Sequence, residues 1–172
     1  MSFNYRLASI GFLGLKEENE DGVNGNFGLY DQNAVLKWVN ANIAAFGGDP
    51  DEVTLMGQST GGQSVFVHNQ WDKSWNLFNK MIVDSGPAVT IQTGATPDQY
   101  FTYGSRFVRQ TECRETARIW QCLRSLSVDQ LRNASRIFPQ LGEGSGALSE
   151  LFRPVGTEDI FPYGNVLTGN NC

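Results

Sequence analysis

The chain has 172 residues, of which 40% are hydrophobic and 18% charged, and it is long enough to bury one core. A net charge of −5 and an isoelectric point near 4.8 argue against nucleic acid or an anionic membrane as partner. No apolar run approaches the length of a membrane span, and no charged-then-apolar leader opens the chain. We therefore expect no integral membrane segment and no signal peptide in this chain.

The first half of the chain predicts alternating helices and strands. Residues 3–7 and 10–15 predict a strand end and a turn with buried apolar anchors, followed by a charged loop. Apolar residues at helical spacing predict an amphipathic helix over residues 29–46, and Gly47-Gly48-Asp49-Pro50 ends it.

A short buried strand is predicted over residues 53–56, a helix over 60–71 and a second short apolar strand over 81–84. Helix–strand–helix–strand is the order typical of a parallel α/β sheet. In the second half, Thr96-Pro-Asp-Gln99 and Ser127-Val-Asp-Gln130 combine a cap with a glutamine three residues later, and each predicts the start of a helix.

Between the first strand and the helix after it lies Gly57-Gln58-Ser59-Thr60-Gly61, which has the pattern G-x-S-x-G of a nucleophile elbow. A serine on such a tight strand-to-helix turn requires neighbours without bulk, which Gly57 and Gly61 provide. Ser59 would stand at a helix N-terminus, where unpaired N–H groups favour developing negative charge. The alternative is an ordinary Gly/Ser turn, since five residues of this pattern occur in many unrelated loops.

The cysteines leave a question open. Cys113 and Cys122 lie nine positions apart (122 − 113 = 9), and this spacing allows either a disulfide or two reduced thiols. Nine helical residues would span about 13.5 Å, too far for a disulfide, so a disulfide requires the helix to begin after Cys113. Asn133-Ala-Ser135 is a glycosylation sequon, which adds some weight to a secreted origin.

A longer set of motifs follows in register from Phe3 to about Ser85. They are Asn4-Tyr-Arg-Leu7, Gly11-Phe-Leu13, Asn26-Phe-Gly-Leu-Tyr-Asp-Gln32, Lys37-Trp-Val39, Asn42-Ile-Ala-Ala-Phe-Gly-Gly-Asp-Pro50, Val53-Thr-Leu55 and Gly57-Gln-Ser-Thr-Gly-Gly62. Together they resemble the type-B carboxylesterase/lipase family, and the similarity continues more loosely to Leu167. The resemblance implies an α/β-hydrolase fold with an incomplete, doubly wound and mostly parallel sheet.

The same resemblance implies a function. It implies a carboxylic-ester hydrolase that acts through a serine nucleophile and an acyl-enzyme, needs no cofactor or metal, is secreted, and takes a small-molecule or lipid ester as substrate. Residues 1–172 would form a partial domain that lacks the N-terminal strands and the C-terminal part with the catalytic acid and histidine.

Site residues follow from the resemblance. Ser59 would be the nucleophile, and the backbone N–H of Thr60 an oxyanion donor. Arg6 and Asp49 would pair as a structural salt bridge, and Cys113 and Cys122 would form a short-loop disulfide. We expect no partner for Cys172 within this chain.

Two neighbours of the nucleophile complete the set. Ser85 resembles a serine close to the family's catalytic histidine, although turn formation explains it equally well. Gln58 departs from the glutamate that family members commonly carry before the serine, and a neutral amide argues against a preference for cationic substrates.

The single histidine, His68, cannot be the base for Ser59. It lies nine residues further along the same expected helix, a rise of about 13.5 Å, whereas a base must come within about 2.6–3.2 Å. We therefore expect His68 to be a packed, hydrogen-bonded residue and the isolated chain to be inactive. Alternatives to an esterase are a catalytically silent binding or adhesion-type relative and a nonfunctional truncated gene product.

Overall fold

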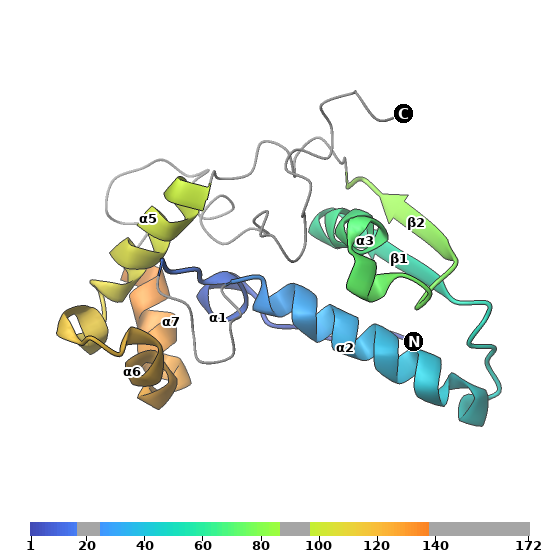
Figure 1. Ribbon diagram of the computed structural model, residues 1–172, viewed down its shortest axis with the longest axis horizontal. Helices are drawn as coiled ribbons and strands as arrows, with labels where there is room; N and C mark the ends of the chain where they lie inside the picture. The colour runs from blue at the N-terminus through green and yellow to red at the C-terminus, as the bar shows by residue number, and fades with distance from the viewer. Residues whose placement is uncertain (17–24, 87–96, 138–172) are drawn as a thin grey trace. The chain divides into compact units, whose positions relative to one another are not determined.

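The computed structural model describes residues 1–16, 25–86 and 97–137 of the chain (Figure 1). The chain forms two compact units. Of the described residues, 1–4 and 29–86 belong to the first unit, and 5–16, 25–28 and 97–137 belong to the second. That residues 1–172 form one partial domain stays a prediction.

The first unit contains a long helix, two strands and the helix between them. Its elements are α2 (Phe27–Asn42, from Leu29 onward), η1 (Ile43–Phe46), β1 (Thr54–Gln58), α3 (Thr60–Gln70), η2 (Asp72–Ser74) and β2 (Lys80–Asp84). The helix predicted over 29–46 is confirmed, although its last turn is the 3₁₀-helix η1. Gly47 ends it in the left-handed conformation with φ 82°, a backbone geometry that glycine adopts without steric strain.

Strands β1 and β2 are parallel, as predicted, and pair in register from Thr54↔Lys80 to Gln58↔Asp84. In Figure 1 they are neighbouring arrows, and α3 packs against both. The prediction that the first strand is buried is wrong, because Met56 is 64% exposed. On the second strand, Ile82 is 50% exposed. Within the described residues the sheet has only these two strands, so neither has a neighbour on its outer edge.

The core of the first unit lies between α2 and α3. Its buried apolar side chains are Leu29, Leu36, Val65, Val67 and Trp71. Polar side chains are also buried there, chiefly Gln32, Asn33, His68 and Ser74. Burial of these polar groups requires hydrogen bonds to compensate for lost hydration.

The second unit is helical in its described part. It contains α1 (Ala8–Phe12), α5 (Pro97–Val108), η3 (Glu112–Glu115), α6 (Ile119–Ser125) and α7 (Val128–Ile137). The strand end predicted over residues 3–7 and the turn after it are wrong, because residues 3–7 form no strand and residues 8–12 form α1. The buried anchors expected there are confirmed in Phe12, Leu13 and Leu15. The charged loop predicted at 16–22 lies outside the described residues, apart from Lys16.

The two predicted helix starts are confirmed. Helix α5 begins at Pro97, the residue expected in its first position. Before α7, Ser127 N–H donates to Gln130 Oε1 at 2.8 Å and Gln130 N–H donates to Ser127 Oγ at 3.2 Å. These reciprocal bonds form the capping box that the sequence predicts.

The core of the second unit is built by α5, α6, α7 and the segment after α1. Its buried members are Leu13, Leu15, Phe107, Val108, Cys113, Leu123 and Ala134. At Gly104 in α5, a Cβ atom would lie 1.8 Å from the carbonyl oxygen of Gly14. Glycine is therefore required there for α5 to approach this segment.

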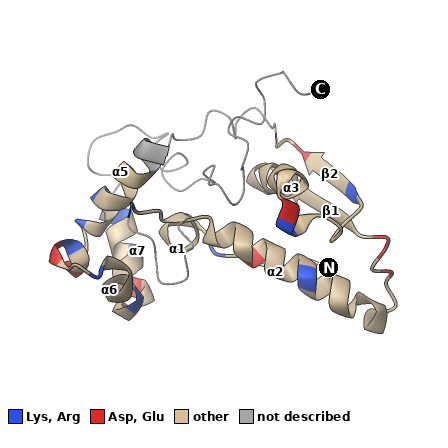
Figure 2. Cartoon of the chain, in the orientation of Figure 1, with Lys and Arg blue, Asp and Glu red and all other residues tan. Residues whose placement is uncertain are grey.

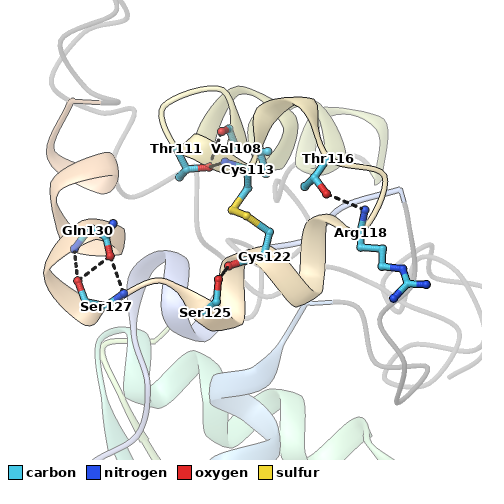
Figure 3. The surroundings of a disulfide bond; sticks show 9 residues. All are labelled: Val108, Thr111, Cys113, Thr116, Arg118, Cys122, Ser125, Ser127 and Gln130. Carbon is cyan, nitrogen blue, oxygen red and sulfur yellow. Dashed lines mark hydrogen bonds between the residues drawn. A yellow bond between two sulfur atoms is a disulfide. The ribbon is translucent and has the colours of Figure 1, made fainter.

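Cys113 and Cys122 are joined by a disulfide, with their Cα atoms 5.6 Å apart (Figure 3). The chain doubles back between them, as a disulfide at this spacing requires. Thr111 Oγ1 accepts a hydrogen bond from Cys113 N–H at 3.2 Å, and Thr116 Oγ1 accepts one from Arg118 N–H at 3.2 Å. The α-helix that carries Cys122 begins at Ile119, after the reversal.

Basic and acidic residues are interspersed along the helices of the second unit (Figure 2). Arg132 Nη2 lies 2.8 Å from Asp129 Oδ1 on α7, and both side chains are exposed. No helix among the described residues combines the length and hydropathy needed to cross a membrane.

Candidate active site

Ser59 lies between β1 and α3 in a strained backbone conformation. Its dihedral angles are φ 54° and ψ −120°, a region that residues with a side chain rarely occupy. The backbone holds it there from two sides, because Ser59 N–H donates to Asp84 O at 2.8 Å and Gln63 N–H donates to Ser59 O at 3.1 Å. Strain of this kind at a strand-to-helix turn is the geometry of a nucleophile elbow.

The elbow also brings its strand and helix into very close contact. A Cβ atom on Gly57 would lie 2.2 Å from Gly61 O, one on Gly62 3.1 Å from Asp84 O, and one on Gly86 2.6 Å from the Gly62 carbonyl carbon. A Cβ on Gly61 would meet no atom within 4 Å. The steric demand expected at Gly57 is therefore present, whereas the demand expected at Gly61 falls on Gly62 and Gly86.

The N-terminus of α3 is not neutralised. Ser59 is its N-cap residue but makes no side-chain capping bond, and the first turn holds no acidic residue. The side chains of Ser59, Thr60 and Gln58 are all exposed. Because the first N–H groups of a helix lack intrahelical partners, this end favours negative charge, which agrees with an oxyanion donor at Thr60. The donor role itself stays a prediction.

Ser85 comes to the same edge of the sheet as Ser59. Gln58 and Asp84 are paired in register, so the serine that follows each strand lies at the carboxyl end of that strand. Ser85 has φ 53°, and its Oγ donates to Asp84 Oδ1 at 2.7 Å. The structure thus brings both predicted serines together, and a role for Ser85 in positioning a histidine stays a prediction.

His68 is buried on α3 and both of its ring nitrogens are occupied. Its Nε2 lies 2.8 Å from Gln32 Oε1, and its Nδ1 lies 2.8 Å from Ser74 Oγ. The amide oxygen can only accept, so Nε2 carries the proton and Nδ1 accepts from the Ser74 hydroxyl. Asn33 Nδ2 donates to the same hydroxyl at 2.9 Å, which leaves its proton free to point at His68.

Burial lowers the pKa of His68 from 6.5 to about 4. At neutral pH the ring is therefore uncharged and fully hydrogen-bonded, as the sequence predicts for a packed residue. A ring held in this way cannot turn to take a proton from Ser59.

The same hydrogen-bonded chain reaches the first turn of the elbow helix. Gln32 Nε2 donates to Ser64 Oγ at 3.2 Å, and Ser64 Oγ donates to Thr60 O at 3.1 Å. No motif in the sequence assigns a role to Asn33, Ser64 or Ser74, and the motif that ends at Gln32 assigns none to its side chain. Two adjacent polar residues inside the predicted amphipathic helix were the available signal, since such residues on a buried face need partners.

Arg6 and Asp49 belong to different units, and their pairing stays a prediction. The Arg6 guanidinium lies over the Phe27 ring, 5.6 Å from its centroid, a cation–π geometry. Asp49 Oδ1 accepts a hydrogen bond from Asp51 N–H at 2.9 Å, just after the end of η1.

Within residues 1–16, 25–86 and 97–137, no group of three or more His, Cys, Asp or Glu side chains is arranged to hold a metal ion. The polar groups beside Ser59 include the Ser85 hydroxyl, the Asp84 carboxylate and the N-terminus of α3. Such a site suits nucleophilic attack on a carbonyl carbon with stabilisation of the resulting oxyanion.

Comparison with known proteins agrees with this geometry. The family model described as "Carboxylesterase family" matches residues 1–166. Lipase 2 of Diutina rugosa is 40% identical over 168 residues, which cover 91% of this chain and 30% of that protein. A secreted triacylglycerol lipase of Gibberella zeae is 39% identical over 166 residues, covering 91% of this chain and 27% of that protein.

Solved structures give the same result. A PNB esterase is 31% identical with a TM-score of 0.78, and the match covers 92% of this chain and 32% of that one. Juvenile hormone esterase from Manduca sexta, solved with OTFP covalently attached, is 34% identical with a TM-score of 0.77 over 92% of this chain and 30% of that one. The chain thus spans about 30% of the length of the relatives it matches. It belongs to the carboxylesterase family and shares the α/β-hydrolase fold of these enzymes.

Proposed function

We propose that the protein to which this chain contributes is a carboxylic-ester hydrolase with Ser59 as its nucleophile. The observation that carries the proposal is the backbone of Ser59, held at φ 54° between β1 and α3. Such strain persists only where the surrounding structure imposes it, and it is characteristic of residues with a mechanistic role.

In this mechanism Ser59 Oγ attacks the ester carbonyl carbon as a base removes the hydroxyl proton. The carbonyl oxygen becomes an oxyanion at the N-terminus of α3, where the Thr60 N–H donates to it. The bond to the alcohol oxygen then breaks, the proton passes to the leaving alcohol, and the acyl group stays on Ser59 until water hydrolyses it.

The base is not His68, whose two nitrogens are bonded to Gln32 and Ser74. His68 is also the single histidine of the 172 residues. We therefore place the catalytic histidine and acid in a part of a longer protein that this chain does not contain, and we expect the chain alone to be inactive.

The substrate is proposed to be a small-molecule or lipid ester. The residue before the nucleophile is the neutral Gln58, so no carboxylate at this position attracts a cationic alcohol group. We expect no nucleic acid partner, because the chain has a net charge of −5. The Cys113–Cys122 disulfide and the secreted lipase among the relatives support an extracellular location.

A fluorophosphonate probe tests the proposal, because it reacts covalently with an activated serine. The full-length protein should be labelled at Ser59 and should hydrolyse a p-nitrophenyl ester, and both signals should vanish in Ser59→Ala. The 172-residue chain alone should do neither above its own Ser59→Ala control.

Two outcomes would change the assignment. Serine-dependent turnover by this chain alone would mean that a base other than a histidine acts on Ser59. A folded full-length protein that is not labelled at Ser59 would overturn the hydrolase and favour a catalytically silent binding relative.

A further inference from the structure

Helix α7 carries a modification motif that ester hydrolysis does not use. Asn133-Ala-Ser135 is the one Asn-X-Ser/Thr sequence of the chain in which X is not proline. Asn133 lies in the middle of α7 and its side chain is exposed. It is distant in sequence from the elbow, so a modification there is independent of the proposed function.

A hollow of about 230 Å³ lies beside Asn133. Polar groups of Thr111, Glu112 and Gln130 line it, together with the apolar side chains of Leu126 and Ala134. A sugar ring presents hydroxyl groups at its edge and C–H groups on its faces, so a concave surface of this mixed composition suits it. Thr111 and Gln130 both lie to the left of the disulfide in Figure 3.

The disulfide adds an independent argument about compartment. Cys113 and Cys122 are bonded in the same unit as Asn133. Disulfides of this kind form and persist in oxidising compartments such as the lumen of the endoplasmic reticulum. Transfer of N-linked oligosaccharides takes place in that compartment of eukaryotic cells.

The packing of α7 determines when Asn133 can be modified. Ser135 Oγ donates to Leu131 O at 3.0 Å and lies 2.6 Å from Ser9 Oγ on α1. The sequon serine is thus engaged and half-buried once α7 has packed against α1. A transferase that needs the Asn and Ser side chains together in an accessible loop must act before this packing.

We propose that Asn133 is an N-glycosylation site, modified before α7 folds, whose first N-acetylhexosamine occupies the adjacent hollow. Nδ2 of Asn133 forms a bond to the anomeric carbon of a polyprenyl-pyrophosphate-linked oligosaccharide. The bond from that carbon to the pyrophosphate breaks, the pyrophosphate lipid leaves with the electron pair, and the amide loses one proton to the medium.

The test is to express the 172-residue chain behind a cleavable secretory leader in a eukaryotic cell and measure its intact mass. A mass above 19.0 kDa that returns to this value after glycan removal is expected. Removal by an amidase in heavy-oxygen water should leave a labelled aspartate at position 133. Because transfer precedes folding, material retained inside the cell serves equally well.

Matched variants identify the site. Asn133→Gln and Ser135→Ala should lose the whole mass increment, whereas Ser135→Thr should keep it because threonine also completes the sequon. Asn69→Gln changes another exposed asparagine, which lies outside any sequon, and this variant should also keep the mass increment. A wild-type chain of unmodified mass, or one whose increment survives Asn133→Gln, would overturn the proposal.

Two further measurements test whether glycosylation precedes folding and whether the first sugar occupies the hollow. The folded, disulfide-bonded chain should stay unmodified when it is incubated with microsomes and lipid-linked oligosaccharide, whereas the reduced and unfolded chain should be modified. Equal modification of the two would refute the claim that Asn133 is glycosylated before α7 folds. Trimming the glycan to its first sugar should leave the melting temperature unchanged, and removing that sugar should lower it. Identical melting after both treatments would mean that the hollow does not hold the sugar.

Discussion

The pH dependence of stability tests the buried polar network of the first unit. His68 is neutral in the folded chain, where burial holds its pKa at about 4, against an ordinary value of 6.5. Between these two values the unfolded chain binds a proton that the folded chain excludes. The stabilising contribution is therefore complete above pH 6.5 and is lost as the pH falls toward 4.

The magnitude follows from the same two values. Each tenfold difference in proton affinity is worth about 1.4 kcal/mol, so the full effect is about 3 kcal/mol. About 2 kcal/mol of this should already be lost at about pH 5, where most carboxylates are still ionised. The physical reason is that burial removes the imidazolium from water and so disfavours the charged form of His68.

The assay is urea unfolding of the chain at about pH 7 and about pH 5, with His68→Gln as control. The variant should be less stable at neutral pH but should lose much less on acidification. The chain has a single histidine, so its ring can also be titrated directly by NMR without assignment. Equal wild-type stability at the two pH values, or a ring that titrates near its ordinary pKa, would refute the reasoning.

Three further predictions concern the elbow and the disulfide. Gly57→Ala should destabilise the chain by about 1–3 kcal/mol through overpacking against Gly61 O and abolish probe labelling of the full-length protein, whereas Gly61→Ala should melt like wild type. A Gly57→Ala variant of unchanged melting temperature would contradict this. Cys113→Ser should lower the free energy of unfolding by about 2.5 kcal/mol in urea titrations, and adding a reductant should then have no further effect. Gln58→Glu should raise kcat/KM of the full-length enzyme for a cationic ester relative to its neutral isostere, and an unchanged ratio would rule out an electrostatic role for this position.

Helix starts and ends are predicted correctly from the sequence where the residues that determine them are close neighbours in the chain. The capping box of Ser127 and Gln130 and the proline start of α5 depend on groups within three residues of one another. Gly47 ends the helix of the first unit for an equally local reason, its left-handed φ of 82°. Residues 8–12 gave no such signal, and the helix α1 was missed; this helix packs against α7, far away in sequence.

At the site, the sequence by itself predicted the elbow, because G-x-S-x-G between an apolar run and a helix is a local pattern. That Ser59 is the nucleophile stays a proposal. It also excluded His68 as base, since helical rise alone separates it from Ser59. Only the tertiary structure shows which groups hold Ser59 and His68 in place. The Asp84 carbonyl that binds Ser59 N–H comes from a strand 25 positions further on (84 − 59 = 25).

Gly62 and Gly86 meet for the same reason, through the pairing of β1 with β2. The partners of His68 come from α2 and η2, elements on either side of α3 in the chain. A sequence motif shows which reactive groups are neighbours in the chain. The close contacts between backbones, the burial of side chains and the proton affinity of His68 arise only when segments distant in sequence pack together.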